Sequence, residues 1–362
     1  MTRKPHLAIF LPSLRGGGAE RVMVTVANGM VDRGYRVDVL LTKAEGPYLQ
    51  DVDRTIEIVD FDRTRVLSSF LPLVRYLRRE KPDAMLSAMS HVNVVAALAR
   101  TASRTSTRLV VSERNDVKQI EGRSPIGLAM RTTYPSADHV VAVSEGIARD
   151  LRRLLHLPDG KVSHIPNPVD VERIRRQGQA RPEHPWFADA AGPIVVATGR
   201  LEAQKDYPTL LKAFASMRGK RGVRLAILGR GSREGDLRRQ ASDLGIADRV
   251  HFAGFQKNPY AWMTHSALFV MSSRHEGFPN ALLEAMACGT PVVSTDCPTG
   301  PHEILDGGRW GALVPVGDPE ALADAMCQTL DDPGPPDVLG RSRIFDPRSI
   351  TLSYARALGL EA

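Results

Sequence analysis

The fold is indicated most directly by residues 268–295, which read LFVMSSRHEGFPNALLEAMACGTPVVST. Two short apolar runs, 268–271 and 291–295, stand on either side of a helical pattern at 280–287. Apolar runs of this length, bounded by Gly and Pro, are typical of strands buried in a parallel sheet. A strand, a helix and a second strand in this order predict a βαβ unit of an α/β domain.

The same alternation runs through both halves of the chain, which has 362 residues and is 43% apolar. In the first half we expect strands at 7–11, 37–42, 84–88, 108–112 and 139–144, and helices at 20–33, 70–80, 93–100 and 146–155. In the second half we expect strands at 194–198, 224–228, 250–252, 268–271 and 291–295, and helices at 207–217, 232–244, 280–287 and 319–330. The sequence therefore predicts two doubly wound, Rossmann-like domains.

A boundary between these domains is expected near Pro166 and Pro168, because proline fits neither a helix interior nor a central strand. The expected parts are a first domain at 1–168, a linker at 169–192, a second domain at 193–345, and a C-terminal helix at 346–362 that packs back toward the first domain. Doubly wound domains bind ligands at the carboxyl ends of their strands. A ligand shared by the two domains would therefore lie in a cleft between them.

The net charge of +7 is concentrated in the first half of the chain. Residues 1–170 hold 25 Lys and Arg against 19 Asp and Glu, a net charge of +6, whereas residues 171–362 hold 23 against 22. An excess of basic residues attracts nucleic acid, anionic lipid or a phosphorylated substrate. Because the sequence contains no helix-turn-helix, RNA-recognition or zinc-finger pattern, we expect no nucleic-acid partner.

The sequence predicts a cytoplasmic protein that is soluble or peripheral to a membrane. The apolar run 7–11 is too short for a signal peptide. No run approaches the ~18 apolar residues of a membrane span. Cys288, Cys297 and Cys327 show no zinc-ligand spacing, and idle thiols of this kind suit a reducing compartment.

Gly199, Arg200, Lys205 and Gly229 follow the carboxyl ends of two expected strands, and Arg200 and Lys205 among them suit a diphosphate. All four should open onto one crevice. Arg offers a flat fork of donors and Lys a point charge, and both neutralise phosphate oxygens. An isolated pair of this kind is more often two solvated surface charges, but the position directly after a strand favours a diphosphate site.

Two glutamates suit the hydroxyl groups of a ligand in the same crevice. Glu276 falls in the loop before an expected helix, and Glu284 falls about one turn inside it. Carboxylates accept paired hydrogen bonds from vicinal hydroxyls, so one can hold a sugar diol and the other a ribose diol. The main-chain N–H groups of Phe278, Asn280 and Ala281 lie at the helix N-terminus, which suits oxyanions and hydroxyls. On spacing alone, two exposed helix-face glutamates would be the simpler interpretation.

From Glu276 to Thr295 the sequence resembles the E-x7-E segment of family-four glycosyltransferases, which are retaining enzymes of the GT-B architecture. Further matches resemble the family's first N-terminal loop, linker, diphosphate motif and base-binding strand, at 16–21, 166–170, 199–206 and 250–254. Together they span nearly the whole chain in order. The resemblance implies an α/β GT-B fold, with two Rossmann-like domains facing a central cleft.

By this resemblance Glu276, Arg200 and Lys205 would be the catalytic residues. Glu276 would contact the donor sugar, Glu284 would bind the ribose, and Arg200 and Lys205 would carry the diphosphate. The donor contacts implied in all are Gly17, Gly18, Gly199, Arg200, Lys205, Gly229, Phe252, Gly254, Glu276, Gly277, Phe278, Pro279, Asn280, Leu282 and Glu284.

The chain departs from the family pattern on the acceptor side. Many members have a histidine after the strand that here reads 109–112, whereas this chain continues with Glu113, Arg114 and Asn115. That sequence occurs in a subgroup resembling bacterial enzymes that extend lipid-linked oligosaccharides. Glu113, Arg114 and Asn115 are therefore candidates for lining the acceptor side, with His91 as a substitute histidine. For His91 a structural or surface role is the alternative.

The subgroup resemblance favours a UDP-sugar donor, such as a UDP-N-acetylhexosamine or UDP-galactose. It also favours a polyprenyl-diphosphate-linked glycan acceptor in cell-surface polysaccharide synthesis. A GDP-mannose-dependent mannosyltransferase is the main alternative. Because no D-x-D motif stands out, we expect no metal and no other cofactor. A non-catalytic nucleotide-sugar-binding protein, a phosphorylase and an epimerase of the same architecture are the rival classes.

A basic cluster in the first half suits a membrane surface. Its cationic residues are Arg63, Arg65, Arg75, Arg78, Arg79 and Lys81, and the apolar residues beside them are Phe70, Leu71, Leu73, Val74 and Leu77. A helix of this composition can lie near an anionic bilayer. A solvated basic helix face is the alternative.

Overall fold

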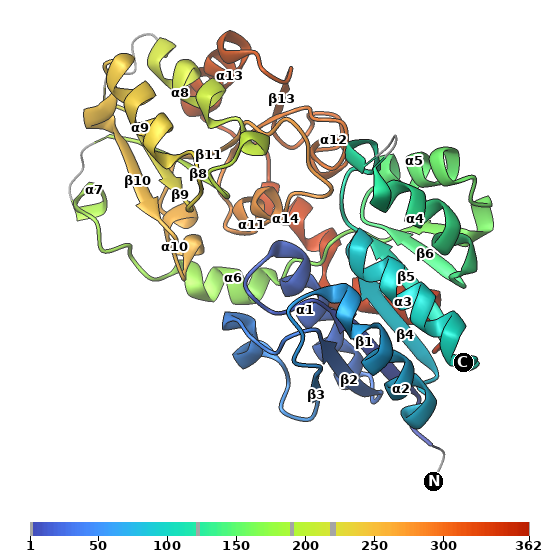
Figure 1. The fold of residues 1–362 in the computed structure, drawn as a ribbon. Coiled ribbons are helices and arrows are strands. Elements are labelled where there is room, and N and C mark those ends of the chain that lie inside the picture. Colours follow the sequence, from blue (N-terminus) through green and yellow to red (C-terminus); the bar gives the residue numbers. More distant parts are fainter. Residues whose placement is uncertain (1–2, 121–123, 189–191, 218–221, 362) are drawn as a thin grey trace. The chain divides into compact units, whose positions relative to one another are not determined.

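The computed structural model describes residues 3–120, 124–188, 192–217 and 222–361. The chain divides into two compact units, one made of Met1–Pro168 with Pro347–Ala362 and the other of Val169–Asp346. Each unit is built on one parallel sheet with helices on both faces (Figure 1). The predicted fold class, two doubly wound α/β domains, is confirmed.

The sheet of the first unit has seven parallel strands in the order β3-β2-β1-β4-β5-β6-β7. The strands are β1 (His6–Leu11), β2 (Arg36–Leu41), β3 (Glu57–Asp60), β4 (Ala84–Ala88), β5 (Arg108–Glu113), β6 (His139–Ala142) and β7 (Val162–His164). The central strands β1 and β4 are buried along their whole length. Strands covered on both faces read as continuous apolar runs, which is why the sequence revealed them.

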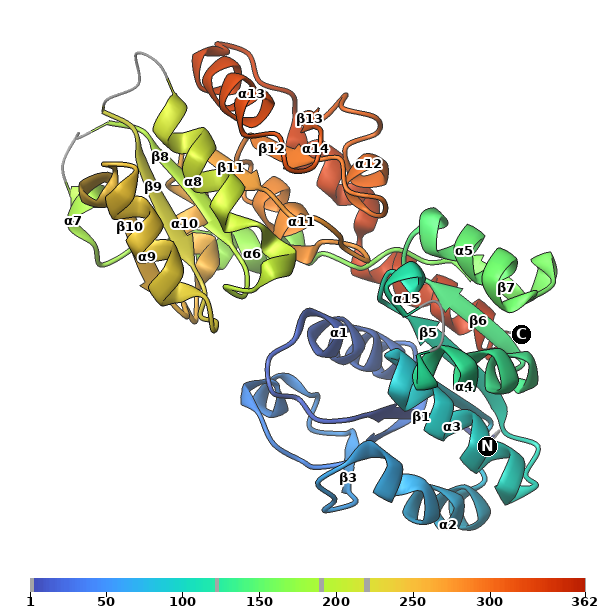
Figure 2. The ribbon, with the colours of Figure 1, turned by 45° about the horizontal axis from the view of Figure 1, so that its top comes forward.

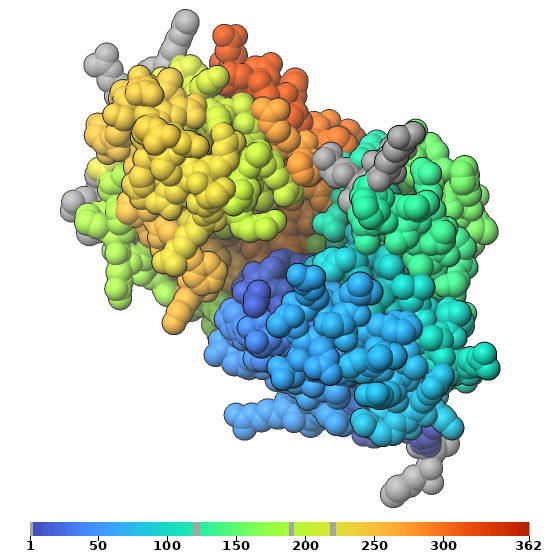
Figure 3. All heavy atoms as spheres, in the orientation of Figure 1, coloured from blue at the N-terminus to red at the C-terminus, as the bar shows by residue number. Residues whose placement is uncertain are grey.

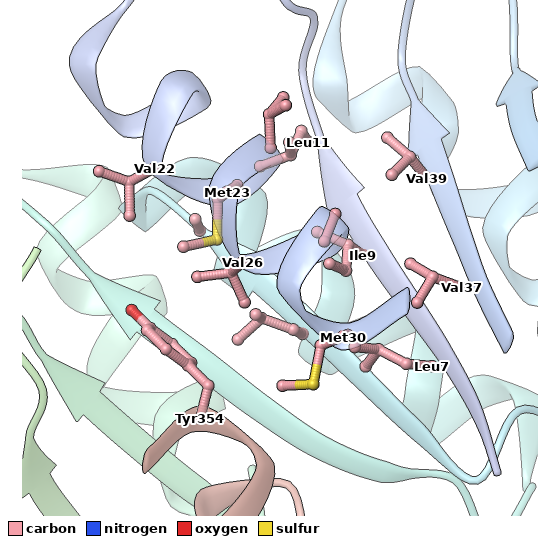
Figure 4. Packing of buried hydrophobic residues seen from close by; sticks show 14 of the residues in the cluster. Leu7, Ile9, Leu11, Val22, Met23, Val26, Met30, Val37, Val39 and Tyr354 are labelled. Carbon is pink, nitrogen blue, oxygen red and sulfur yellow. The ribbon is translucent and has the colours of Figure 1, made fainter. Parts of the chain in front are cut away.

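Helices on both faces of this sheet bury its apolar residues. They are α1 (Gly18–Asp32), α2 (Phe70–Glu80), α3 (Ser90–Ser103), α4 (Pro125–Thr133), α5 (Glu145–Leu155) and α15 (Pro347–Ala357). Helix α1 presents Val22, Val26 and Met30 to the sheet, at the spacing of an amphipathic helix (Figure 4).

Helix α15 completes the core of the first unit, although the whole second unit precedes it in the chain. Tyr354 of α15 is fully buried on the side of α1 (Figure 4), and its hydroxyl lies 3.5 Å from Oγ of Ser112 on β5. Figure 2 shows α15 against the same sheet. A Cβ at Gly29 of α1 would lie 2.5 Å from Oγ1 of Thr351, so a glycine is needed where the two helices meet.

The sheet of the second unit has six parallel strands in the order β10-β9-β8-β11-β12-β13. The strands are β8 (Ile194–Thr198), β9 (Arg224–Leu228), β10 (Val250–Gly254), β11 (Leu268–Met271), β12 (Val292–Thr295) and β13 (Ala312–Val314). The helices are α6 (Val171–Gly178), α7 (Pro185–Ala188), α8 (Tyr207–Ser216), α9 (Glu234–Asp243), α10 (Pro259–Thr264), α11 (Asn280–Ala287), α12 (Pro301–Ile304), α13 (Pro319–Asp331) and α14 (Val338–Ser342). Leu210, Phe214, Ile227 and Met326 belong to its buried core.

The segment expected as a linker begins with an ordered helix. Asp170 caps α6, because its carboxylate accepts a hydrogen bond from the N–H of Arg173 at 2.9 Å. Val171 and Ile174 are buried, and α6 packs against α10 and α11. Residues from Val169 onward therefore belong to the second unit.

Most expected elements are present with small shifts at their ends; the helix expected at 93–100, for example, spans Ser90–Ser103. The short strands β3, β7 and β13 were outside the prediction, because three or four residues carry no clear periodicity. In the part of the chain that the structure describes, no helix combines the length and apolarity needed to cross a bilayer.

Candidate functional site

The second sheet reverses its strand order between β8 and β11, which lie side by side. From β8 the chain builds one side of the sheet and then returns to build the other from β11 onward. Doubly wound sheets bind ligands at the carboxyl ends of strands at such a reversal. Lys205 is the last residue of a 3-10 turn, Ala203–Lys205, that follows β8. Glu276 lies in the loop between β11 and α11. Two of the predicted catalytic residues thus come from the two sides of the reversal.

Lys205 and Glu276 are in direct contact. Nζ of Lys205 donates a hydrogen bond to Oε1 of Glu276 at 2.5 Å, and the hydroxyl of Ser273 donates to the same oxygen at 2.7 Å. The side chains of Lys205 and Glu276 are 19% and 9% exposed. The main-chain carbonyl of Glu276 also accepts a hydrogen bond from the hydroxyl of Thr299. A charge-assisted bond in a mostly dry position holds the carboxylate in one place.

This contact is informative because the family resemblance assigned the two residues to neighbouring parts of one donor, Lys205 to the diphosphate and Glu276 to the sugar. An ammonium and a carboxylate that neutralise each other avoid an uncompensated charge in a mostly buried position. A diphosphate would compete with Glu276 for the ammonium of Lys205, and a sugar hydroxyl could donate to the carboxylate that is released. The ligand contacts themselves stay predictions.

Glycines bring the main chain of three strands together at this edge of the sheet. Gly229 has a φ of +140°, and a Cβ there would lie 2.0 Å from the carbonyl oxygen of Gly199. The N–H of Gly199 donates to the carbonyl of Leu228, and the N–H of Gly229 donates to that of Gly254. Gly199, Gly229 and Gly254, all predicted donor contacts, therefore form one line of main-chain groups, and at Gly229 only glycine allows the approach. Arg200 follows with an exposed side chain.

The predicted residues Gly277, Phe278, Pro279 and Asn280 form the entry to α11. Asn280 is the first residue of the helix, and Pro279 precedes it in an extended conformation. Gly300 packs against this entry: its φ is +92°, and a Cβ there would lie 2.6 Å from Cδ of Pro279. The first turn of an α-helix presents N–H groups that have no partner within the helix, which favours a phosphate or hydroxyl here.

Glu284 lies in the second turn of α11 and is half-buried. Its Oε1 accepts a hydrogen bond at 3.2 Å from the hydroxyl of Tyr260, a buried residue of α10. The phenol orients the carboxylate. Ribose binding by Glu284 stays a prediction.

Three predicted donor residues have buried side chains: Phe252, Phe278 and Leu282. The guanidinium of Arg238 lies 4.7 Å from the ring centroid of Phe252, and the ring of Phe278 meets that of Phe345 edge-on at 5.7 Å. Any contact that these three residues make with a donor must therefore use main-chain atoms.

In the first unit, the glycine loop after β1 is bound by its own helix. The N–H groups of Gly16 and Gly17 donate to Oε2 of Glu20 at 2.9 and 2.7 Å, and Glu20 is buried. Gly17 and Gly18 are exposed. A phosphate that approaches this loop would have to rely on groups other than these two N–H groups, so the predicted role of Gly17 and Gly18 stays untested.

Glu113 is fully buried at the end of β5. Its Oε1 accepts hydrogen bonds from the hydroxyl of Ser90 at 3.0 Å and from the N–H groups of Arg114 and Asn115 at 2.9 and 3.0 Å. Its Oε2 accepts from the hydroxyl of Tyr134 at 2.6 Å. Burial raises the pKa of the Glu113 carboxyl, and the hydrogen bonds oppose that shift. The carboxylate therefore ties α3 and the loop after β5 together.

The other acceptor-side candidates divide between interior and surface. Arg114 is buried; its guanidinium donates to the hydroxyl of Tyr354 at 3.4 Å and to the side-chain oxygen of Asn167. Asn115 and His91 are exposed, His91 in the first turn of α3. Arg114 thus connects the end of β5 with α15 and with Asn167, near the end of the segment Met1–Pro168.

Sequence reasoning missed Tyr207 and Thr299, and it placed Ser273 in the stretch of the site without giving it a role. The hydroxyl of Tyr207 donates to the carbonyl of Gly199 at 3.2 Å, and burial together with the Glu276 carboxylate raises the pKa of Tyr207. Ser273 lies three residues before Glu276, so its place in the loop was an available signal. The contact of Thr299 depends on the tertiary fold and has no sequence signal.

Within the described residues, no group of three or more His, Cys, Asp or Glu is placed to hold a metal ion. Burial raises the pKa of Cys297 to about 12, and the Glu276 carboxylate adds to the shift. This thiol is therefore neutral at ordinary pH and is no nucleophile. Catalysis without a metal stays a prediction.

Two protein-family models match the chain. The model described as Glycosyltransferase Family 4 matches residues 16–173, and the model described as Glycosyl transferases group 1 matches residues 192–332. The first match contains the glycine loop, and the second contains Lys205, Glu276 and Glu284.

Known proteins match the chain over most of its length. The lipopolysaccharide core biosynthesis glycosyltransferase LpsE of Rhizobium meliloti is 31% identical over 322 residues, which cover 88% of this chain and 87% of LpsE. The N-acetylgalactosamine-N,N'-diacetylbacillosaminyl-diphospho-undecaprenol 4-alpha-N-acetylgalactosaminyltransferase of Campylobacter jejuni is 27% identical over 344 residues, 90% of each chain. The crystal structure of Anabaena HepE in complex with UDP and glucose has the same fold, with a TM-score of 0.80 at 21% identity over 99% of this chain and 100% of that one. The chain therefore belongs to family 4 of the glycosyltransferases, GT-B enzymes that take a sugar from a nucleotide-sugar donor and typically retain its anomeric configuration.

Proposed function

We propose that the protein is a retaining glycosyltransferase that uses a UDP-sugar as donor. It moves a hexose or N-acetylhexosamine to a polyprenyl-diphosphate-linked glycan, in the synthesis of a cell-surface polysaccharide or glycoconjugate. The observation that carries the proposal is the contact between Lys205 and Glu276 at the reversal of the second sheet. One group suits the diphosphate and the other the sugar, which are neighbouring parts of the same donor.

The reaction divides the work between these groups. The acceptor hydroxyl attacks the anomeric carbon from the side on which the diphosphate leaves, so the configuration is retained. The bond from this carbon to the diphosphate oxygen breaks, and that oxygen takes the proton of the acceptor. Lys205 and Arg200 stabilise the negative charge that builds on the diphosphate. Glu276 orients the sugar by accepting hydrogen bonds from its hydroxyls.

The relatives support the choice of donor and acceptor classes. HepE was solved with UDP and glucose, and the Campylobacter relative is named for an acceptor linked to diphospho-undecaprenol. LpsE is named for lipopolysaccharide core biosynthesis. Each name supports one part of the proposal: HepE the UDP-sugar donor, the Campylobacter relative the lipid-linked acceptor, and LpsE the cell-surface glycan.

The structure changes which residues of the basic cluster could meet a membrane. Leu73, Val74 and Leu77 of α2 are buried in the core of the first unit, so they face the sheet rather than a bilayer. Leu67 and Leu71 are 70% and 58% exposed. Leu67 lies in a 3-10 turn, Val66–Ser69, that precedes α2. It was not among the residues of the basic cluster expected from the sequence.

We define the α2 patch as Arg63, Arg65, Leu67, Leu71 and Arg75, all of which are exposed. These residues belong to the light-blue segment on the outer face of the first unit in Figure 3. Exposed leucines among arginines suit an anionic lipid surface, which supplies both apolar contact and negative charge. The proposed location is the inner face of the cell membrane, where the protein is peripheral and cytoplasmic.

A thermal-shift panel tests the donor. UDP, UDP-N-acetylglucosamine, UDP-galactose, UDP-glucose, GDP and GDP-mannose are added to the full chain, and a ligand at 100 times its Kd should stabilise the protein by about 2.7 kcal/mol. We expect a response to the UDP series and a much weaker response of Lys205→Ala to UDP. A response to GDP and GDP-mannose alone would favour the mannosyltransferase alternative.

Turnover assays separate the remaining alternatives. Binding without release of UDP, even with polyprenyl-diphosphate glycans present, would favour a non-catalytic binding protein. Turnover that requires free phosphate would indicate a phosphorylase. Epimerisation of the donor sugar in the absence of an acceptor would indicate an epimerase. Loss of transfer in EDTA that added Mg²⁺ restores would overturn the expectation of metal-independent catalysis.

A further inference from the structure

The loops that carry Lys205 and Glu276 are joined by contacts outside the pair itself. The carbonyl of Gln204 accepts a hydrogen bond from the N–H of Arg274 at 2.8 Å. The side-chain amide of Gln204 donates to the carbonyl of His275, also at 2.8 Å. Gln204 therefore holds the residue next to Glu276 in one loop, while it is itself the residue next to Lys205 in the other.

Further contacts join the two loops on the far side of Lys205. The hydroxyl of Ser272 donates to the carbonyl of Lys205 at 2.8 Å. Asp206 is buried, with a left-handed φ of +46° that Asp tolerates, and its Oδ2 lies 3.1 Å from Nε of Arg274. The residues on both sides of Lys205 are thus bound to the loop that carries Glu276.

We infer that Gln204 is a positioning residue, which fixes the loop of Lys205 against the loop of Glu276. In this arrangement the ammonium of Lys205 can meet the diphosphate of a donor while the carboxylate of Glu276 meets its sugar. The inference rests on the proposed function. A lysine side chain has several rotatable bonds and does not fix its own distance from Glu276. A misplacement of about 1 Å at a reacting centre can cost about 100-fold in rate.

The side-chain contacts of this loop pair can be removed one at a time. Gln204→Met keeps the length of the side chain and removes the donor to His275, while the main-chain contacts remain. Asp206→Asn keeps both shape and tolerance of the left-handed conformation, and removes only the charge that faces Arg274. Gln240→Met is the matched control, since the amide of Gln240 also donates to a main-chain carbonyl, that of Pro208 at 3.0 Å in the first turn of α8, and makes no bridge between the two loops.

The experiment is a double-mutant cycle on the full chain. UDP release from the donor of the panel that turns over fastest is measured for the wild type, Gln204→Met, Lys205→Ala and the double variant. We expect Gln204→Met to lower kcat tenfold to a hundredfold with KM changed less than threefold, and Asp206→Asn to act in the same direction. In the Lys205→Ala background Gln204→Met should change kcat less than threefold, because there the group that it positions is missing.

Other results would overturn the inference. If Gln204→Met kept the kcat of the wild type, or lowered kcat equally with and without Lys205, the amide of Gln204 would have only a structural role. The same conclusion would follow if Gln240→Met lowered kcat as much as Gln204→Met. If the wild type turns over no nucleotide sugar, the proposed function fails instead. A crystal structure of Gln204→Met then decides the inference: Lys205 displaced from Glu276 would support it, and an unchanged Lys205–Glu276 contact would reject it.

Discussion

The two sheets reverse their strand order at equivalent places, between β1 and β4 in the first unit and between β8 and β11 in the second. At the carboxyl edge of the second sheet, Glu276 receives hydrogen bonds from two side chains, Lys205 and Ser273. At the same edge of the first sheet, Glu20 receives two main-chain N–H groups, and Glu113 receives two main-chain and two side-chain groups.

The difference lies in whether the partner can be replaced. A lysine side chain can turn from a carboxylate to a phosphate, whereas a main-chain N–H group can leave its carboxylate only if the loop rearranges. The same topology therefore carries an acid with a movable lysine partner in the second unit, as a ligand site would need, and acids that hold loops in place in the first.

The largest expected effect is on catalysis in the second unit. Glu276→Ala and Lys205→Ala should each lower transfer by about 100- to 1,000-fold, since each removes a group that we propose acts on the donor. Transfer is followed by UDP release, and folding by circular dichroism. Glu234→Ala, which removes an exposed ion pair with Arg238 on α9, is the control and should keep its activity. Near wild-type activity in either site variant would remove the site assignment.

A smaller effect is expected on stability in the first unit. Glu113→Ala removes the acceptor of four hydrogen bonds in the interior and should lower the free energy of unfolding by about 3 kcal/mol in a urea titration. Glu145→Ala, at a side chain that is 50% exposed, should change it by less than 0.5 kcal/mol, roughly the limit for surface positions. If Glu113→Ala kept its stability and lost transfer, Glu113 would belong to the acceptor site and the contrast between the units would fail.

The smallest effect concerns the outer surface of the first unit. In flotation with anionic vesicles at low salt, Leu67→Ser and Leu71→Ser should each weaken association by about 1 kcal/mol, because each leucine is more than half exposed. The control is Ile344→Ser in the second unit, at a side chain that is 55% exposed. Equal losses in all three variants, or no association of the wild type, would contradict a membrane role of the α2 patch.

The sequence predicted the long elements because their patterns are local. The strand at 194–198 and the helices at 70–80 and 280–287 have the predicted bounds in the structure. The strand β7 has only three residues and exists because it pairs with β6, which no local pattern reveals. Helix α6 lies in a segment rich in charged residues, and this polar composition led us to expect a linker. The N-cap residue Asp170 was the sequence signal for the helix.

The site could be predicted where it depends on strand ends. Lys205 and Glu276 follow β8 and β11 closely, so the topology brings them together. Glu284 accepts a hydrogen bond from Tyr260, 24 residues away, and one of the partners of Glu113 is Tyr134, 21 residues away. Those contacts depend on how helices pack on the sheets, and the inward direction of the Glu113 carboxylate could therefore not be predicted.

The place of α15 has a consequence for biosynthesis. A ribosome delivers the second unit, Val169–Asp346, before the helix that fills the core beside α1. Domains generally fold as units during synthesis, so the second unit can complete its core while the first still lacks Tyr354 and leaves the crossing at Gly29 uncovered. The first unit can therefore bury the α15-facing side of α1 only after the whole second unit has been synthesised.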